Sequence, residues 1–292
     1  MPERRPEFCA EVSLENAESA AATASRVDHW MLVEYRGLWG HDAVAASGLP
    51  AAVKAWLREQ RDARPNTKVL FLRRPGRRAH PTLAVFWGSS CAHEEALFHA
   101  EIEAYDDLLG LDLTAAGSER LPHPLLIVCT HGKHDRCCAR YGRPLYKALE
   151  EQADDDWVWQ SSHLGGDRFA GNVVILPEGL YFGRVKPSDA WSVLDEYLAG
   201  RIMLDRYRGR SIHGFSEQAA EIAVRRMTGL RAIADLDLVD HDGPHIRFCG
   251  GGRMFDVGVV YEPGELTYLT CSAETLRRPR HYAVEILRES AA

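Results

Sequence analysis

The order of short apolar runs and amphipathic segments in the middle of the 292-residue chain is the feature that most constrains its fold. Residues 125–129 (LLIVC) are apolar and of strand length, a polar loop follows, and a helix is expected to begin near Pro144. Residues 158–162 predict a second strand. Residues 172–185 predict a hairpin, because Pro-Glu-Gly separates two β-rich runs.

A helix over residues 188–200 follows this hairpin, with Ser188 as its N-cap and Gly200 at its end. The resulting order, β-α-β and then β-β-α, is that of a thioredoxin-like core within an α/β fold. The first half offers a similar order of elements. A strand is expected at 29–35, a helix at 50–63, and two further strands at 68–73 and 82–88. The first half is either a degenerate copy of the same core without ligands or an unrelated α/β unit.

The remaining part of the chain predicts an appended, mostly antiparallel β segment. An amphipathic helix is expected at 216–229, and short β runs follow it, the last of them LTYLTC at 266–271. The turn-rich stretch 114–124 is the best candidate for a domain boundary. We therefore expect three units: an N-terminal α/β domain (1–120), a thioredoxin-like domain (121–205) and a C-terminal α+β extension (206–292).

Charge and hydropathy exclude two classes of partner. The net charge of −7 provides no basic field for a nucleic-acid backbone. No apolar run approaches the ~20 residues that cross a bilayer, so no membrane attachment is expected. The first residues also lack the apolar stretch of a signal peptide, which predicts a cytoplasmic protein.

The chain's chemistry is concentrated in Cys129, Cys138 and His163. Each lies in, or next to, a predicted loop that leaves a strand end, and such loops converge at one edge of a sheet. Thiolate and imidazole bind zinc, copper and iron–sulfur clusters, and the basic residues between the two cysteines would lower the pKa values of the thiols. Each residue alone is weak evidence, because a cysteine that ends an apolar strand is more often part of the core.

Two motifs at these residues resemble one family. Cys129 and Cys138 form C-x8-C, and HLGGDRFAGN, which begins at His163, follows. This pattern is similar to that of the thioredoxin-like [2Fe–2S] ferredoxins, also called sucrase/ferredoxin-like proteins, and the similarity extends over nearly the whole chain. The resemblance implies a thioredoxin-like ferredoxin domain with a [2Fe–2S] cofactor. It also implies an electron carrier, not an enzyme with its own substrate, that acts with a redox partner protein.

The resemblance also implies a ligand set, from which this sequence departs at one position. The family holds its cluster with two cysteines and two histidines, the second histidine closing an H-x-G-G-H segment, and here that residue is Asp167. The implied ligands are therefore Cys129, Cys138, His163 and Asp167, with Cys137 or water as a substitute fourth ligand. A carboxylate in place of imidazole adds negative charge and should lower the potential of the cluster.

Two other readings of the same residues stay open. Two cysteines, a histidine and an aspartate also make an acceptable tetrahedral zinc site, in which three ligands and a water could be hydrolytic. Alternatively, the change at Asp167 marks a cluster-free protein that only binds a partner. Of the other cysteines, Cys249 and Cys271 are expected to be buried small hydrophobes, and Cys9 and Cys91 structural or incidental.

Overall fold

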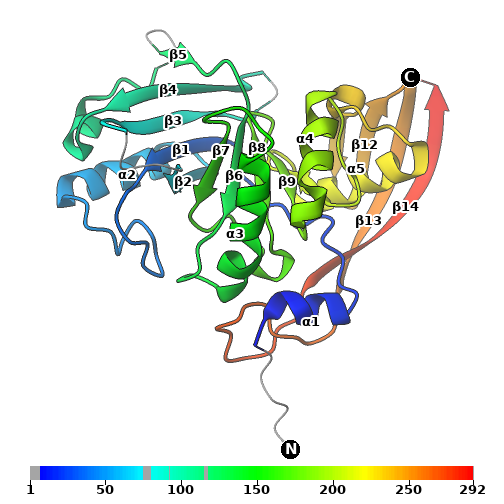
Figure 1. Cartoon of the computed structure of the whole chain (residues 1–292). Coiled ribbons are helices and arrows are strands. Elements are labelled where there is room, and N and C mark those ends of the chain that lie inside the picture. Colours follow the sequence, from blue (N-terminus) through cyan, green and yellow to red (C-terminus); the bar gives the residue numbers. More distant parts are fainter. Residues whose placement is uncertain (1–6, 75–79, 92, 115–117, 292) are drawn as a thin grey trace, which may run out of the picture.

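The computed structural model describes residues 7–74, 80–91, 93–114 and 118–291 (Figure 1). Within these ranges, ten strands form one sheet in the order β10-β9-β8-β6-β7-β2-β1-β3-β4-β5, and four form a separate sheet in the order β11-β12-β13-β14. The expected fold class, α/β with an appended antiparallel C-terminal segment, is confirmed. The helices are α1 (Cys9–Glu15), α2 (Ala51–Ala63), α3 (Arg136–Glu150), α4 (Ala190–Leu198) and α5 (Phe215–Thr228).

The strands of the large sheet are short, as the sequence predicts. They are β1 (His29–Glu34), β2 (Thr67–Arg73), β3 (Leu83–Ser89), β4 (Ala96–Ile102), β5 (Glu119–Arg120), β6 (Leu125–Cys129), β7 (Val158–Ser161), β8 (Val173–Leu176), β9 (Leu180–Phe182) and β10 (Tyr207–Arg210). The strands of the smaller sheet are β11 (Asp237–Asp242), β12 (His245–Gly250), β13 (Arg253–Pro263) and β14 (Arg280–Ala291).

The two halves of the large sheet have the same strand pairing. In the second half, β6 pairs in parallel with β7 and antiparallel with β8, and β8 pairs antiparallel with β9. In the first half, β1 pairs in parallel with β2 and antiparallel with β3, and β3 pairs antiparallel with β4. This pattern of strand pairing therefore occurs twice, although a short 3-10 turn (Tyr105–Gly110) follows β4 in the described part of the first half, whereas α4 follows β9 in the second half. The halves meet where β2 and β7 pair antiparallel at Leu72 and Ser161.

Alternation along the strands distributes apolar side chains over the two faces of the large sheet. One face forms a core shared by both halves, which includes Trp30, Leu72, Ile127 and Trp159. On the other face, the two halves have separate cores beside α2 and beside α3 and α4. Cys129 and Cys138 both belong to the shared core, so the predicted ligands lie where the two halves meet.

Helix α3 begins eight residues before the predicted start at Pro144, which lies inside the helix. The cause is Asp135, whose side chain accepts a hydrogen bond from Cys137 N at 2.8 Å and caps the helix. Cys138 is therefore on the first turn of a helix and not in a loop. The helix packs tightly against the end of β6, since a Cβ at Gly142 would lie 1.9 Å from Cys129 O.

Two further expectations for local structure were wrong. LTYLTC at 266–271 is not a strand: it makes an isolated bridge between Thr267 and Arg277, and the fourth strand of the smaller sheet is β14. Ser188 does not cap α4, because a short 3-10 turn precedes the helix and Asp189 accepts from Lys186 N at 3.0 Å instead. No helix of the described residues combines the length and apolar character needed to cross a bilayer.

Candidate metal centre

The fold brings the four predicted ligands together at the carboxyl ends of β6 and β7. Cys129 ends β6, Cys138 lies on the first turn of α3, and His163 and Asp167 flank the glycines that follow β7. The donor atoms of Cys129, Cys138 and His163 lie within 4.8 Å of one another. Both thiols are 1% exposed, so any metal held here is shielded from solvent on the cysteine side.

Asp167 joins this group through two contacts. Its Oδ1 lies 3.2 Å from Cys138 Sγ and 3.0 Å from His163 Nδ1, and the residue is 5% exposed. The separation between Cys138 Sγ and His163 Nδ1 is 4.0 Å. The carboxylate therefore points into the group and does not turn outward into solvent.

The loop that carries His163 and Asp167 is held by buried polar contacts. Arg208 donates from Nη1 to Gly165 O at 3.0 Å and to Asn172 Oδ1 at 2.9 Å, and Asn172 Nδ2 donates to Gly166 O at 2.8 Å. Gly166 has φ +81° and lies so close to Arg208 that a Cβ would approach Nη2 to 2.3 Å. The glycines and the arginine together fix where His163 and Asp167 lie.

The electrostatics of the group favour a thiolate. A hydrogen bond from the Cys138 thiol, together with the nearby His163, holds the pKa of Cys129 well below its ordinary value. That hydrogen bond, burial and the carboxylate of Asp167 raise the pKa of Cys138. Burial disfavours the imidazolium of His163, but the contacts with Asp167 and Cys129 outweigh it and raise its pKa to about 9. The metal-free group thus holds protons on Cys138 and His163, and a bound metal would replace these protons.

His134 is a further candidate donor, which the sequence indicated only as one of the basic residues between Cys129 and Cys138. Its ring stacks on that of His163 with the centroids 3.7 Å apart, and donor atoms of His134, His163 and Asp167 lie within 4.8 Å of one another. His134 lies in the loop before α3, four residues ahead of Cys138. Its place between the two cysteines is not a ligand position of the motif that the resembling ferredoxins share, so the sequence did not indicate it as a donor.

The first half contributes a cover over the histidines, and none of its described residues belongs to the group. Gly40 O contacts His131 Nε2 at 2.6 Å, and His41 O contacts His134 Nδ1 at 3.2 Å. A cavity of about 280 Å³ opens beside them, lined by Lys68, His163 and the histidines of this cover, among others. The side chain of His163 is 24% exposed, so the histidine side of the group faces solvent.

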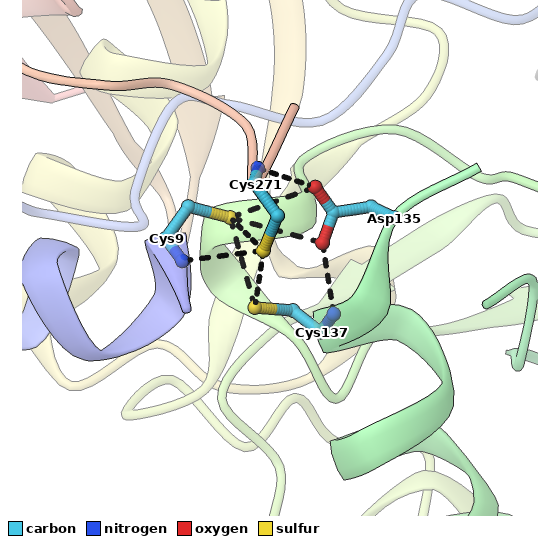
Figure 2. A group of neighbouring side chains, drawn as sticks. All are labelled: Cys9, Asp135, Cys137 and Cys271. Atoms are coloured by element: carbon cyan, nitrogen blue, oxygen red, sulfur yellow. Dashed lines mark hydrogen bonds between the residues drawn. The ribbon is translucent and has the colours of Figure 1, made fainter. Parts of the chain in front are cut away.

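Cys137, the predicted substitute ligand, lies in a different group. Its Sγ is 3.7 Å from Cys9 Sγ and 3.4 Å from Cys271 Sγ, and Asp135 completes the group (Figure 2). All seven cysteines are in the described part of the chain, and the structure joins none of them in a disulfide. Cys9 and Cys271 are 262 residues apart, and no spacing motif in the sequence links them.

Solved structures and curated proteins give similarities over limited parts of the chain. A thioredoxin-like [2Fe-2S] ferredoxin from Aquifex aeolicus is 20% identical, with a TM-score of 0.27, over 31% of this chain and 94% of that chain. A serine variant of that ferredoxin is 21% identical, with a TM-score of 0.26, over 29% and 97%.

Two yeast proteins, both named "Altered inheritance of mitochondria protein 32", are 33% identical over 95 residues. They come from Meyerozyma guilliermondii and Debaryomyces hansenii, and the match covers 29% of this chain. The chain spans about a third of the length of these relatives, 34% and 35% respectively.

The broadest match is to a family. The sequence profile described as sucrase/ferredoxin-like matches residues 20–209, which is more than half of the chain and includes all four predicted ligands. The resemblance noted from the two motifs is thereby confirmed, and this chain belongs to the sucrase/ferredoxin-like family.

Proposed function

We propose that this protein binds a [2Fe–2S] cluster and carries single electrons to or from a partner protein. The observation that carries the proposal is the convergence of two buried thiols, an imidazole and a carboxylate at one edge of the sheet. Each iron of such a cluster needs two protein ligands in addition to the bridging sulfides. The group offers four donors, so its chemistry fits the cofactor.

The ligands divide into a cysteine side and a histidine side. Cys129 and Cys138, both in the buried core, would hold one iron. His163 would hold the other, together with Asp167, whose Oδ1 lies 3.0 Å from His163 Nδ1. His134 is a second candidate for that position, because it would restore the two-cysteine, two-histidine set of the resembling ferredoxins.

Positive groups near the site would balance an anionic cluster. Lys68 Nζ donates to Leu164 O at 2.7 Å, next to His163, and burial lowers its pKa to about 8 although Cys129 and Asp167 favour its charged form. The guanidinium of Arg208 is buried beside the same loop. Lys68 and Arg208 would stabilise the negative charge of the cluster without being ligands of its iron.

The cluster would supply one-electron chemistry, and the protein would determine where electrons leave. The cysteine side is shielded by the shared core, whereas His163 and His134 border the open cavity. A redox partner would therefore dock on the histidine side, over the cover formed by Gly40 and His41. This placement gives the first half a role although none of its described residues is a ligand in this proposal.

Zinc is the second candidate occupant. Three donor atoms within 4.8 Å of one another, from Cys129, Cys138 and His163, can also surround a single tetrahedral ion. With Asp167 as the fourth ligand the site would be closed. With water in that position it could activate that water for hydrolysis.

The decisive experiment is anaerobic purification of the full chain, followed by its absorption spectrum and analysis for iron, acid-labile sulfide and zinc. The proposal predicts about two iron and two sulfide per chain, with visible charge-transfer absorption. Reconstitution with iron and sulfide that yields a colourless protein with zinc bound through Cys129 and Cys138 would contradict it.

A further inference from the structure

A second group of thiols lies on the other side of the first turn of α3. It combines Cys9, the first residue of α1, with Cys137 and Asp135 at the start of α3 and Cys271 from the loop that joins β13 and β14 (Figure 2). Figure 1 shows α1 and that loop side by side below the large sheet. Three segments that are distant in sequence therefore meet at one point.

The three sulfurs form a nearly equilateral triangle. The Sγ atoms of Cys9 and Cys137 are 3.7 Å apart, those of Cys137 and Cys271 are 3.4 Å apart, and those of Cys9 and Cys271 are 3.7 Å apart. Two thiolates on one tetrahedral zinc, each with a Zn–S bond of about 2.3 Å, are about 3.8 Å apart. The observed edges match that spacing.

Asp135 occupies the fourth corner. Its two oxygens lie 3.9 and 3.8 Å from Cys9 Sγ, and each accepts a backbone hydrogen bond, Oδ1 from Cys137 N at 2.8 Å and Oδ2 from Cys271 N at 2.7 Å. The carboxylate is therefore fixed in orientation by two of the segments that it would join through the metal. Such outer contacts orient metal ligands.

Backbone N–H groups also point at the sulfurs. Cys9 N donates to Cys271 Sγ at 3.4 Å and Ala10 N donates to Cys137 Sγ at 3.5 Å. Hydrogen bonds from N–H groups are stronger when the acceptor is anionic, so these two contacts would strengthen when the sulfurs bind a metal as thiolates. Thiolates are the form that binds zinc.

Burial makes the group costly without a cation. Cys9, Cys137, Cys271 and Asp135 are between 0 and 6% exposed. Among the described residues, Asp135 has no salt bridge to a lysine, arginine or histidine, although a buried carboxylate needs a compensating charge. The apolar cluster around it is small, with Ala10 and Ala170 as its other buried members.

From this geometry we infer that Cys9, Cys137, Cys271 and Asp135 form a second, structural metal site that takes one zinc ion. All four donor atoms lie within 4.8 Å of one another, which suits a single closed tetrahedral ion. Binding would release the remaining thiol protons and tie α1 and the β13–β14 loop to α3. Because Cys137 and Cys138 are adjacent, the same ion would hold the helix turn that carries a proposed cluster ligand.

The test measures zinc and iron in the full chain, expressed with zinc present and purified without chelator. About one zinc per chain is expected, falling at least about tenfold in Cys9→Ser and in Cys271→Ser, with circular dichroism confirming that each variant is folded. Cys249→Ser, a half-buried cysteine outside both groups, is the matched control and should keep its zinc. Asp135→Asn should lower zinc affinity while retaining a side-chain oxygen for the helix cap.

Variants in the other group separate this inference from the proposed function. Cys129→Ser should keep its zinc and lose its iron, whereas Cys9→Ser should lose its zinc and keep its iron. Cobalt(II) added to zinc-free Cys129→Ser should give the thiolate charge-transfer absorption of a tetrahedral sulfur site. Zinc that is absent from the wild-type protein, that survives Cys9→Ser, or that is replaced by a disulfide between two of the three cysteines would overturn the inference.

Discussion

The two halves of the large sheet place different chemistry at the same position. In the second half, Cys129 pairs with Ser161 across β6 and β7, and His163 follows two residues later. In the first half, Glu34 pairs with Leu72 across β1 and β2, and Arg74 follows two residues later. Strand register therefore makes Glu34 the counterpart of Cys129 and Arg74 the counterpart of His163.

The first-half pair is a closed ion pair. Arg74 Nη2 lies 2.8 Å from Glu34 Oε2, the side chain of Glu34 is fully buried, and Ala84 N donates to the same oxygen at 3.1 Å. The negative charge of the Glu34 carboxylate is therefore compensated within the protein, without a metal. In the second half, the corresponding residues are Cys129 and His163, whose thiolate and imidazole are metal ligands. The same position of the fold can therefore hold either an internal ion pair or a cofactor.

The largest expected effect is on iron binding by the two cysteines of the second half. Cys129→Ser and Cys138→Ser should each remove essentially all bound iron and visible absorption, because the core offers no other thiol to that iron. Iron analysis of the purified variants measures this directly. Cys137→Ser should keep its iron, and the opposite pattern, with Cys138→Ser coloured and Cys137→Ser colourless, would reverse the assignment.

The second effect is on the stability of the fold, through the ion pair of Glu34 and Arg74 in the first half. Arg74→Ala should lower the free energy of unfolding by up to about 3–5 kcal/mol, because it leaves the buried Glu34 carboxylate with only the partly exposed Arg36 as a cationic partner, at 3.4 Å. Denaturant unfolding of the cluster-free protein measures the loss. Adding Glu34→Gln to the same background should recover part of it, since the amide carries no charge. A loss below about 1 kcal/mol would show that the ion pair is not the structural counterpart of the metal site.

The sequence predicted β1 to β3 and β6 to β9, because their apolar runs are bounded by clear turn residues, but it did not predict the sheet-edge strands β5 and β10. The strand ends that carry Cys129, Cys138 and His163 indicated one site for these three residues, and the family resemblance added Asp167. The sequence did not predict the early start of α3, which depends on the cap at Asp135, nor β14. His134 and the Cys9–Cys271 contact depend on how distant segments pack, and no periodicity in the sequence records such contacts.

A third prediction concerns the fourth ligand on the histidine side. Asp167→Ala should leave iron bound but make its loss in air several-fold faster, because His134 lies within reach of the vacated position. His134→Ala alone should have little effect, whereas the double variant should lose most of its iron. The rate of bleaching of the visible absorption follows each case. Equal stability of Asp167→Ala and the double variant would exclude His134 as a substitute ligand.

The smallest effect is a shift of potential. Asp167→His should retain the cluster and raise its reduction potential by on the order of 100 mV, because a neutral imidazole replaces an anionic carboxylate and the reduced cluster gains negative charge. The potential should also vary more with pH, since the new imidazole has a second nitrogen that can lose or gain a proton. Electrochemical titration at several pH values measures both effects. Asp167→Asn is the matched control, because it removes the charge at nearly constant shape but gives no ring nitrogen to titrate. If Asp167 made only loop hydrogen bonds, neither variant would move the potential, and the carboxylate would then be a structural residue beside the cluster, as uninvolved in its chemistry as Glu34 is in the first half.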